Sequence, residues 1–169
     1  MKFDQARQSI LSWIENFVEV ANPDLNGWPP CPFARRTRLE HRLDIRPGTS
    51  LLVDGYDVVD TWNDRYDVVI TVYSRHKYSS TEVSDAVAAL NKMSLPKDIL
   101  FLDDHPDDTE LVNNVCMNQG EYILVLTQRF SKVNEASADL KSQGYYKLWP
   151  NDYYDKVVGW RERYGFDDN

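Results

Sequence analysis

The stretch Leu95–Asn114, LPKDILFLDDHPDDTELVNN, decides how the rest of this chain is interpreted. Its apolar run Ile99–Leu102 changes abruptly into the acidic run Asp103–Asp108, which contains a single histidine. A short apolar run bounded by prolines is typical of a strand buried on both faces, so we expect a central strand here. Ionisable side chains that follow such a strand lie at the rim of the sheet, where layered α/β proteins place their sites.

The acidic run has two interpretations. In the first, His105, Asp104 and Asp108 form an acid–base or metal site. Oxygen ligands with one imidazole suit iron(II), manganese or magnesium, so a divalent metal is the candidate cofactor. In the second, Pro106-Asp107-Asp108 begins a helix, with proline at the first position and acids in the first turn. The absence of HxD or HExxH spacing favours the second interpretation.

The spacing of apolar residues predicts the remaining elements. We expect helices over residues 4–20, 32–38, 50–63, 80–93, 107–118, 131–142 and 151–164. We expect strands over residues 39–45, 66–73, 98–102, 122–127 and 145–149. Strands that alternate with helices indicate an α/β layered fold. The prediction is one domain over residues 1–169, with a mixed central sheet of about five strands flanked by helices.

A second candidate site lies at Cys31, between Trp28-Pro29-Pro30 and Pro32. Pro32 suits the first position of a short helix, which would place the thiol at the helix N-terminus. A thiol in that position, followed by arginines, has a lowered pKa and acts as a nucleophile. The alternative is an inert buried cysteine in a proline-rich turn, because cysteine is among the most buried residue types.

The densest positive stretch follows directly and comprises Arg35, Arg36, Arg38, Arg42 and Arg46. Guanidinium groups bind carboxylates and phosphates with two parallel hydrogen bonds, which predicts a docking patch for an anionic small molecule. The alternative is that these arginines pair with the protein's own acids, for example those at residues 103–108, or form a solvated face. The sequence favours the alternative, because most charge runs form solvated faces.

Aromatic residues crowd the last quarter of the chain: Tyr145, Tyr146, Trp149, Tyr153, Tyr154 and Trp160. If their rings are exposed, they form a docking surface for a protein partner. More often such residues cover the edge of a core. The neighbouring acids argue against stacking on nucleic acid, which requires interleaved basic residues.

Composition narrows the class of protein. The 169 residues carry a formal net charge of −8, which argues against general binding to nucleic acid or to an anionic membrane. No run approaches the ~20 apolar residues that span a bilayer. Cys31 and Cys116 are the two cysteines, too few for a disulfide framework. We therefore expect an acidic cytoplasmic protein with reduced thiols and no nucleic-acid or membrane partner.

Several segments together resemble an uncharacterised family of small bacterial proteins. Four features match that family in order and rough spacing: the turn Cys31-Pro32-Phe33-Ala34 after an N-terminal helix, the pair His105-Pro106, Asn113 or Asn114, and the strand ending at Arg129. The family's Asn-Arg-Ser-Pro signature is absent here. The resemblance implies no particular activity. It does imply a shared site formed by Cys31, Arg35, His105, Asn114 and Arg129.

Two hypotheses follow. The first is a small enzyme that acts on a small anionic molecule at the sheet rim. Cys31 would be its nucleophile or soft ligand, and His105 its general base or metal ligand. Arg35, Asn114 and Arg129 would bind the substrate. The second is a non-enzymatic domain that docks a protein partner through its aromatic C-terminal surface or an acidic face. The first hypothesis requires Cys31 and His105 to share one hollow.

Overall fold

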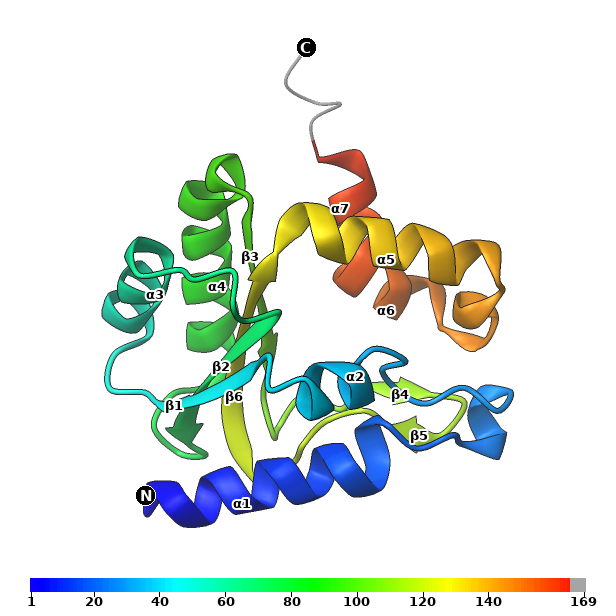
Figure 1. Ribbon diagram of the computed structural model, residues 1–169, viewed down its shortest axis with the longest axis horizontal. Helices are drawn as coiled ribbons and strands as arrows, with labels where there is room; N and C mark the ends of the chain where they lie inside the picture. Colours follow the sequence, from blue (N-terminus) through cyan, green and yellow to red (C-terminus); the bar gives the residue numbers. More distant parts are fainter. Residues whose placement is uncertain (165–169) are drawn as a thin grey trace.

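Four strands rich in β-branched residues form the central sheet of the computed structural model, which describes residues 1–164 (Figure 1). They are β1 (Leu43–Pro47), β2 (Val68–Ser74), β3 (Ile99–Asp104) and β6 (Tyr122–Arg129), in the spatial order β1-β2-β6-β3. β1 is parallel to β2, and β6 is antiparallel to both β2 and β3. Leu126 of β6 lies opposite Ile70 on one side and Leu102 on the other. The predicted mixed α/β fold is confirmed.

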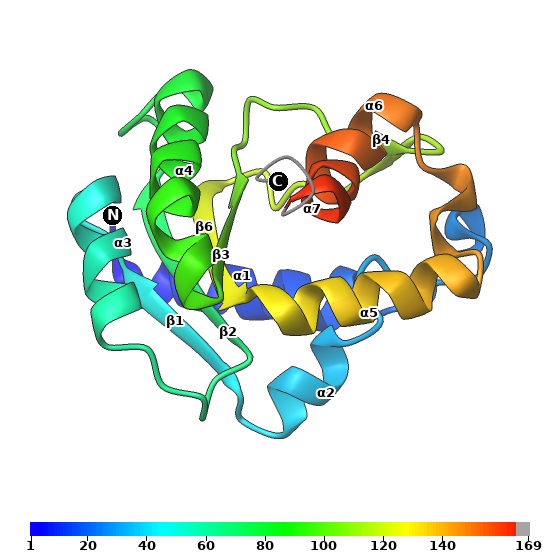
Figure 2. The same cartoon turned by 90° about the horizontal axis from the view of Figure 1, so that it is seen from above.

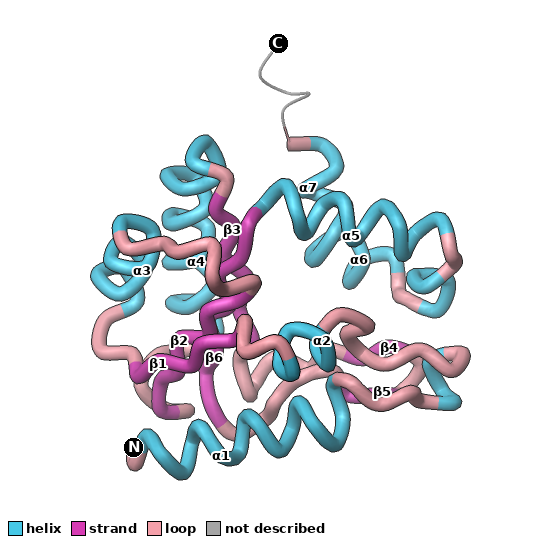
Figure 3. The backbone as a smooth tube through the Cα atoms, viewed as in Figure 1, coloured by secondary structure: helices cyan, strands magenta, loops and turns pink. Residues whose placement is uncertain are grey.

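Helices pack along both faces of the sheet, as the tube in Figure 3 shows. The α-helices are α1 (Phe3–Trp13), α2 (Ala34–Leu39), α3 (Leu51–Asp60), α4 (Ser80–Ser94), α5 (Phe130–Ser142), α6 (Asn151–Tyr154) and α7 (Trp160–Arg163). Short 3-10 turns span Pro23–Leu25, Leu95–Lys97 and Tyr145–Leu148, and π-helical segments span Ile14–Val18 and Asp155–Gly159. The helices predicted over residues 4–20, 50–63, 80–93 and 131–142 are confirmed apart from their ends.

Each face of the sheet has its own core. Side chains of α3 and α4, such as Leu51 and Leu90, pack on Phe101 and Val125 on one face. Side chains of α1, such as Ile10, pack on the other face. Seen from above, α3 and α4 lie on one side while α5 extends away from the end of β6 (Figure 2). Because α5 extends away from the sheet, the side chains on its inner side do not pack in the sheet core. They line a separate space, which is described below.

The prediction that residues 98–102 form a central strand is wrong in one respect, because β3 lies at the edge of the sheet. Most of its residues are nevertheless buried, and α4 supplies hydrogen bonds to Ile99 and Phe101 on its open side. The Asn91 amide accepts from the Phe101 N–H (2.8 Å) and donates to the Phe101 carbonyl (2.9 Å). The Ser94 hydroxyl donates to the Ile99 carbonyl (2.9 Å). An edge strand protected in this way cannot be distinguished from a central strand by its apolar pattern.

The helix predicted over residues 107–118 is wrong. β4 (Leu111–Val112) and β5 (Val115–Cys116) form a two-stranded hairpin there. Its loop consists of Asn113 and Asn114, at φ 46° and 65°. A two-residue hairpin loop of type I′ requires positive φ at both positions, and asparagine tolerates this conformation. The asparagine pair therefore decides the local structure.

Two predicted strands also differ. Residues 145–148 form a 3-10 turn after Gly144, which has φ 83°. The strand predicted over residues 39–45 begins only at Leu43, because Leu39 ends α2 and His41 has φ 55°. In both places a left-handed residue interrupts the chain where alternation suggested an extended backbone.

Within residues 1–164, no helix has the length and apolar character needed to cross a membrane. The cytoplasmic location expected from the sequence stays a prediction.

Replacing Asn91 tests how far β3 depends on α4. Asn91→Ala leaves a buried N–H and a buried carbonyl of Phe101 without partners, so we expect the free energy of unfolding to fall by about 2–4 kcal/mol. Ser94→Ala removes one such bond and should cost about 1 kcal/mol. Urea denaturation measures both values. A loss below that of Ser94→Ala would contradict the role assigned to Asn91.

Candidate functional site

A cavity of about 420 Å³ lies on the α1 side of the sheet, facing α5. Ligand pockets in proteins measure about 300–1,000 Å³, so the space suits a small organic molecule. Its walls are mainly apolar or aromatic and come from all the surrounding elements: Trp13, Val18, Phe33, Val68, Leu126, Ala136, Tyr146 and Val158. Both π-helical segments contribute residues, Ile14 and Val18 from one and Val157 and Val158 from the other.

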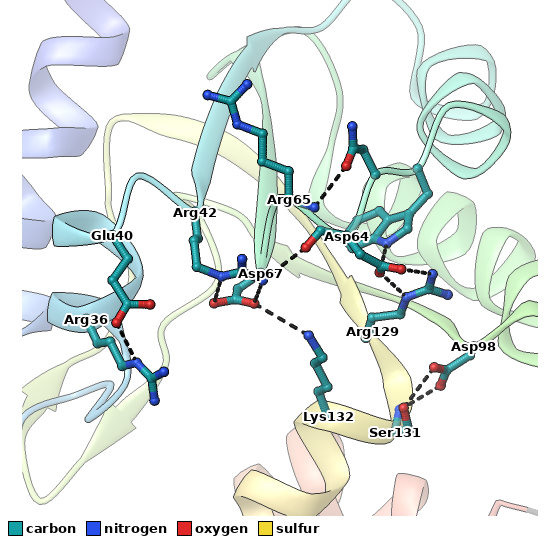
Figure 4. A network of polar contacts seen from close by, with 12 residues as sticks. Arg36, Glu40, Arg42, Asp64, Arg65, Asp67, Asp98, Arg129, Ser131 and Lys132 are labelled. Carbon is teal, nitrogen blue, oxygen red and sulfur yellow. Dashed lines mark hydrogen bonds and ion pairs between the residues drawn. The ribbon is translucent and has the colours of Figure 1, made fainter.

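Polar contacts hold α5 in place as one wall of the cavity (Figure 4). The Asp98 carboxylate accepts hydrogen bonds from the Ser131 N–H (2.7 Å) and hydroxyl (2.8 Å) at the start of α5. The next residue, Lys132, lies 3.7 Å from Asp67, which Arg42 also binds through two hydrogen bonds of 2.7 and 2.8 Å. Helix α5 is thus tied to the turn before β3 and to the start of β2.

The aromatic C-terminal quarter forms another wall. The Tyr145 hydroxyl donates to the Pro30 carbonyl, which joins this segment to the turn before α2. Trp149 stacks on Tyr153 with ring centroids 4.8 Å apart. None of the six aromatic residues singled out above is exposed. Tyr145, Tyr146 and Trp149 line the cavity, and the six residues do not form the exposed docking surface that the second hypothesis requires.

Lys156 and Tyr153 fasten the same segment to the hairpin. The Tyr153 hydroxyl donates to Glu110 (3.1 Å), and Lys156 contacts the other oxygen of Glu110 (3.1 Å). Residues 151–163 therefore pack between the acidic end of β3 and helix α5. This position brings Arg161 to the cavity.

Arg161 is the main polar feature of the cavity wall, and only 4% of its surface is exposed. Its guanidinium donates to the Val157 carbonyl (2.8 Å), the Asn134 amide oxygen (2.7 Å) and the Ser137 hydroxyl (3.2 Å). These three acceptors are neutral. Burial lowers the pKa of Arg161 below its usual value, yet a guanidinium keeps its proton in proteins. The wall thus holds a buried positive charge.

No carboxylate of residues 1–164 forms an ion pair with Arg161. The adjacent Glu162 is bound by Lys141, at 2.8 and 3.0 Å, and by the Tyr154 hydroxyl at 2.8 Å. Glu162 thus acts on Arg161 only through space. A buried charge without a contacting counterion is costly in a folded protein. The free energy of this site is therefore sensitive to any anion that reaches it.

Cys31 also lines the cavity, but it does not have the properties predicted for a nucleophile. α2 begins at Ala34, whose N–H donates to the Cys31 carbonyl (3.2 Å), and backbone hydrogen bonding from Phe33 and Ala34 lowers the pKa of the thiol. These bonds favour the thiolate. Burial opposes them and is the stronger effect, so the pKa of the Cys31 thiol lies above its usual value. The geometry supports the interpretation as a half-buried, protonated thiol.

His105 is not part of this cavity. Its Nδ1 accepts from the Asp107 N–H (3.1 Å), so the proton lies on Nε2, which donates to the Tyr78 carbonyl (3.1 Å). Tyr78 packs on the core beneath α4, whereas Cys31 packs on the core beneath α1. The structure thus places Cys31 and His105 on opposite faces of the sheet and does not bring them together.

The predicted metal ligands do not converge either. Asp104 accepts from the Gln119 N–H (2.9 Å) and the Asn118 amide (3.2 Å), and Asp108 accepts from the Ser80 hydroxyl (2.6 Å). Over residues 1–164, no group of three or more His, Cys, Asp or Glu side chains is arranged to hold a metal ion. The acidic run serves to fasten neighbouring loops to β3.

The other predicted site residues are also dispersed. Arg35 is exposed on α2, and Asn114 is exposed in the loop of the hairpin. Arg129 borders the cavity, but its guanidinium donates to the Asp64 carboxylate at 2.8 and 3.1 Å. This contact lowers the pKa of Asp64 to about 2. Most of the arginine run pairs with the protein's own acids, as in the contacts Arg36–Glu40 (2.9 Å) and Arg38–Glu19 (2.7 Å).

Comparisons of this chain with protein-family models, with curated proteins and with solved structures found no match. The resemblance described above is therefore untested. The fold and the cavity alone define the class, which is an α/β layered domain with one large, mainly apolar cavity beside its sheet.

Sequence reasoning did not single out Arg161. A signal was present, because Arg161 follows Val157 by four residues and Val158 by three. This spacing places it on the apolar stripe of the last helix. A charged residue on an apolar stripe is a candidate for a buried functional group.

The buried carboxyl of Asp104 predicts a pH dependence of stability. Burial raises the pKa of Asp104 to about 6, and its hydrogen bonds oppose this only in part. An unfolded aspartate has a pKa of about 3.9, so the folded state binds the proton more tightly. The contribution of the Asp104 carboxyl to the free energy of unfolding is fully present below about pH 4. It is lost as the pH rises through about 6.

We therefore expect the Asp104 contribution to the free energy of unfolding to be about 1 kcal/mol larger at pH 5 than at pH 7. Asp104→Asn should lack this gain in urea denaturation at the two pH values. Asp85→Asn, at an exposed position on α4, is the control and should retain it. Equal pH dependence in the wild type and Asp104→Asn would refute the assignment.

The two cysteines should differ in reactivity. Cys116 is exposed, whereas the Cys31 thiol is held protonated by burial. At pH 7.5 iodoacetamide should alkylate Cys116 at least about tenfold faster than Cys31, because the thiolate is the reacting form. Peptide mass spectrometry over a time course measures both rates. Faster modification of Cys31 would restore the nucleophile interpretation.

Proposed function

We propose that this protein binds a small organic molecule, most of whose surface is apolar, in the cavity beside α5. The observation that carries the proposal is the cavity itself, with about 420 Å³ of space and mainly apolar walls. A space of this size with mainly apolar walls falls in the range of small-molecule sites in proteins.

The composition of the walls supports a ligand with few polar groups. Small-molecule sites combine hydrophobic and aromatic walls with a small number of fixed polar groups. Trp13, Phe33 and Tyr146 supply such walls. Arg161, Ser137 and Tyr146 supply polar groups at one side. The arrangement is that of a binding site with one polar end.

The proposal is for binding, and it assigns no catalytic role. Cys31 lies in the wall as a protonated thiol, and His105 bonds to Tyr78 on the other side of the sheet. The paired nucleophile and base of the enzyme hypothesis are therefore missing from the cavity. The small-molecule part of that hypothesis is retained, together with the predicted cytoplasmic location.

A neutral fluorescent probe tests the proposal. N-phenyl-1-naphthylamine becomes strongly fluorescent in apolar surroundings, and we expect saturable binding to the wild type. Ala136→Phe places a ring in the cavity from α5, and it should weaken the affinity at least about tenfold, which corresponds to ~1.4 kcal/mol.

Ala138→Phe is the matched control, because Ala138 is exposed on the same helix. It adds the same ring outside the cavity and should leave the affinity unchanged. Absence of saturable binding to the wild type, or equal weakening by both substitutions, would refute the proposal.

A further inference from the structure

The chemistry of the ligand can be argued from the hydrogen bonds of Arg161, an inference that rests on the proposed function. A guanidinium has five N–H donors, one on Nε and two on each terminal nitrogen. Nε donates to Val157, one terminal nitrogen to Asn134 and the other to Ser137. Among the described residues these are its acceptors, so each terminal nitrogen retains one N–H. Two N–H donors of a planar guanidinium can bind the two oxygens of one carboxylate.

The charge balance of the cavity points the same way. Arg129 and Lys132 also border it, but Asp64 binds Arg129 (2.8 Å), and Lys132 lies beside Asp67 (3.7 Å). Arg161 is bonded only to neutral groups within residues 1–164. Glu162 acts on Arg161 through space but makes no ion pair with it, because Lys141 binds the Glu162 carboxylate. A ligand with one negative charge could therefore bind the guanidinium directly.

The position of Arg161 sets the orientation of such a ligand. Arg161 lies where the last helical segment contacts α5, and its partner Ser137 is itself only 8% exposed. Apolar side chains, among them Val68 and Leu126 of the sheet, line the rest of the space. A ligand that satisfies both regions has a charged group at one end and an apolar body.

We propose that the occupant of the cavity is an organic carboxylate, with its anionic group bound by Arg161 and its apolar body against the sheet and the aromatic wall. The assignment differs from the sequence-based prediction, in which Arg35 or Arg129 bound the anion. It identifies Arg161 as the residue that determines specificity.

Two probes of nearly equal shape test the assignment. Naphthalene-2-carboxylate has one negative charge, and naphthalene-2-carboxamide is neutral. Isothermal titration calorimetry at pH 7.5 should give at least about tenfold tighter binding of the carboxylate to the wild-type protein, since bidentate, charge-assisted hydrogen bonds are about twice as strong as neutral ones.

Two substitutions locate the source of this preference. Arg161→Gln removes the charge and should reduce the carboxylate-to-amide affinity ratio to about one, with amide binding retained as evidence that the cavity persists. Arg35→Gln, an exposed arginine outside the cavity, should leave the ratio unchanged. If Arg161→Gln does not fold, Arg161→Lys keeps a charge without the fork and should show a smaller but real preference.

The outcomes separate this inference from the proposed function. Equal affinity of the two probes for the wild type, or a preference that survives Arg161→Gln, overturns the carboxylate assignment and leaves a cavity for neutral molecules. Binding of N-phenyl-1-naphthylamine without binding of either naphthalene probe also overturns it. Failure of all three probes to bind overturns the proposed function as well.

Discussion

The antiparallel insertion of β6 between β2 and β3 determines where the other parts of this protein lie. β1, β2 and β3 all point the same way, so their carboxyl ends meet at one rim, which carries the acidic run. β6 runs against them and therefore ends at the opposite rim. Because α5 starts at Phe130, directly after β6, it stands over that opposite rim and encloses the cavity there. A single reversed strand thus separates the acidic cluster from the cavity.

The elements with strong local patterns were predictable from sequence. The β-branched run of β2 and the capping box of α4, in which Ser79 and Glu82 bond reciprocally, are encoded by neighbouring residues. The order of the strands was not predictable, because pairing joins segments far apart in the chain. β3 illustrates this limit, since Asn91 and Ser94 complete its backbone hydrogen bonds as a neighbouring strand would.

The candidate site was harder to predict than the fold. The rule that sites lie at the carboxyl ends of parallel strands led to His105, but in this fold those ends are occupied by loop-fastening contacts. Cys31 was correctly associated with the turn before α2 and lines the cavity. Its reactivity depends on burial, which a local motif does not encode. For Arg161 the opposite holds. Its residue type suggests an exposed side chain, whereas its position on the apolar stripe of the last helix indicates a buried one.

The two π-helical segments give the cavity a property that its volume does not express. A π-helix has wider turns than an α-helix, and its i→i+5 hydrogen bonds are seldom maintained for long, so such segments recur at functional sites. Here one segment ends the first helix and the other lies in the last helical region, and both supply wall residues. The cavity is therefore bordered on two sides by helical backbone with wider turns than an α-helix, and these turns set the spacing of Ile14, Val18, Val157 and Val158 along its wall.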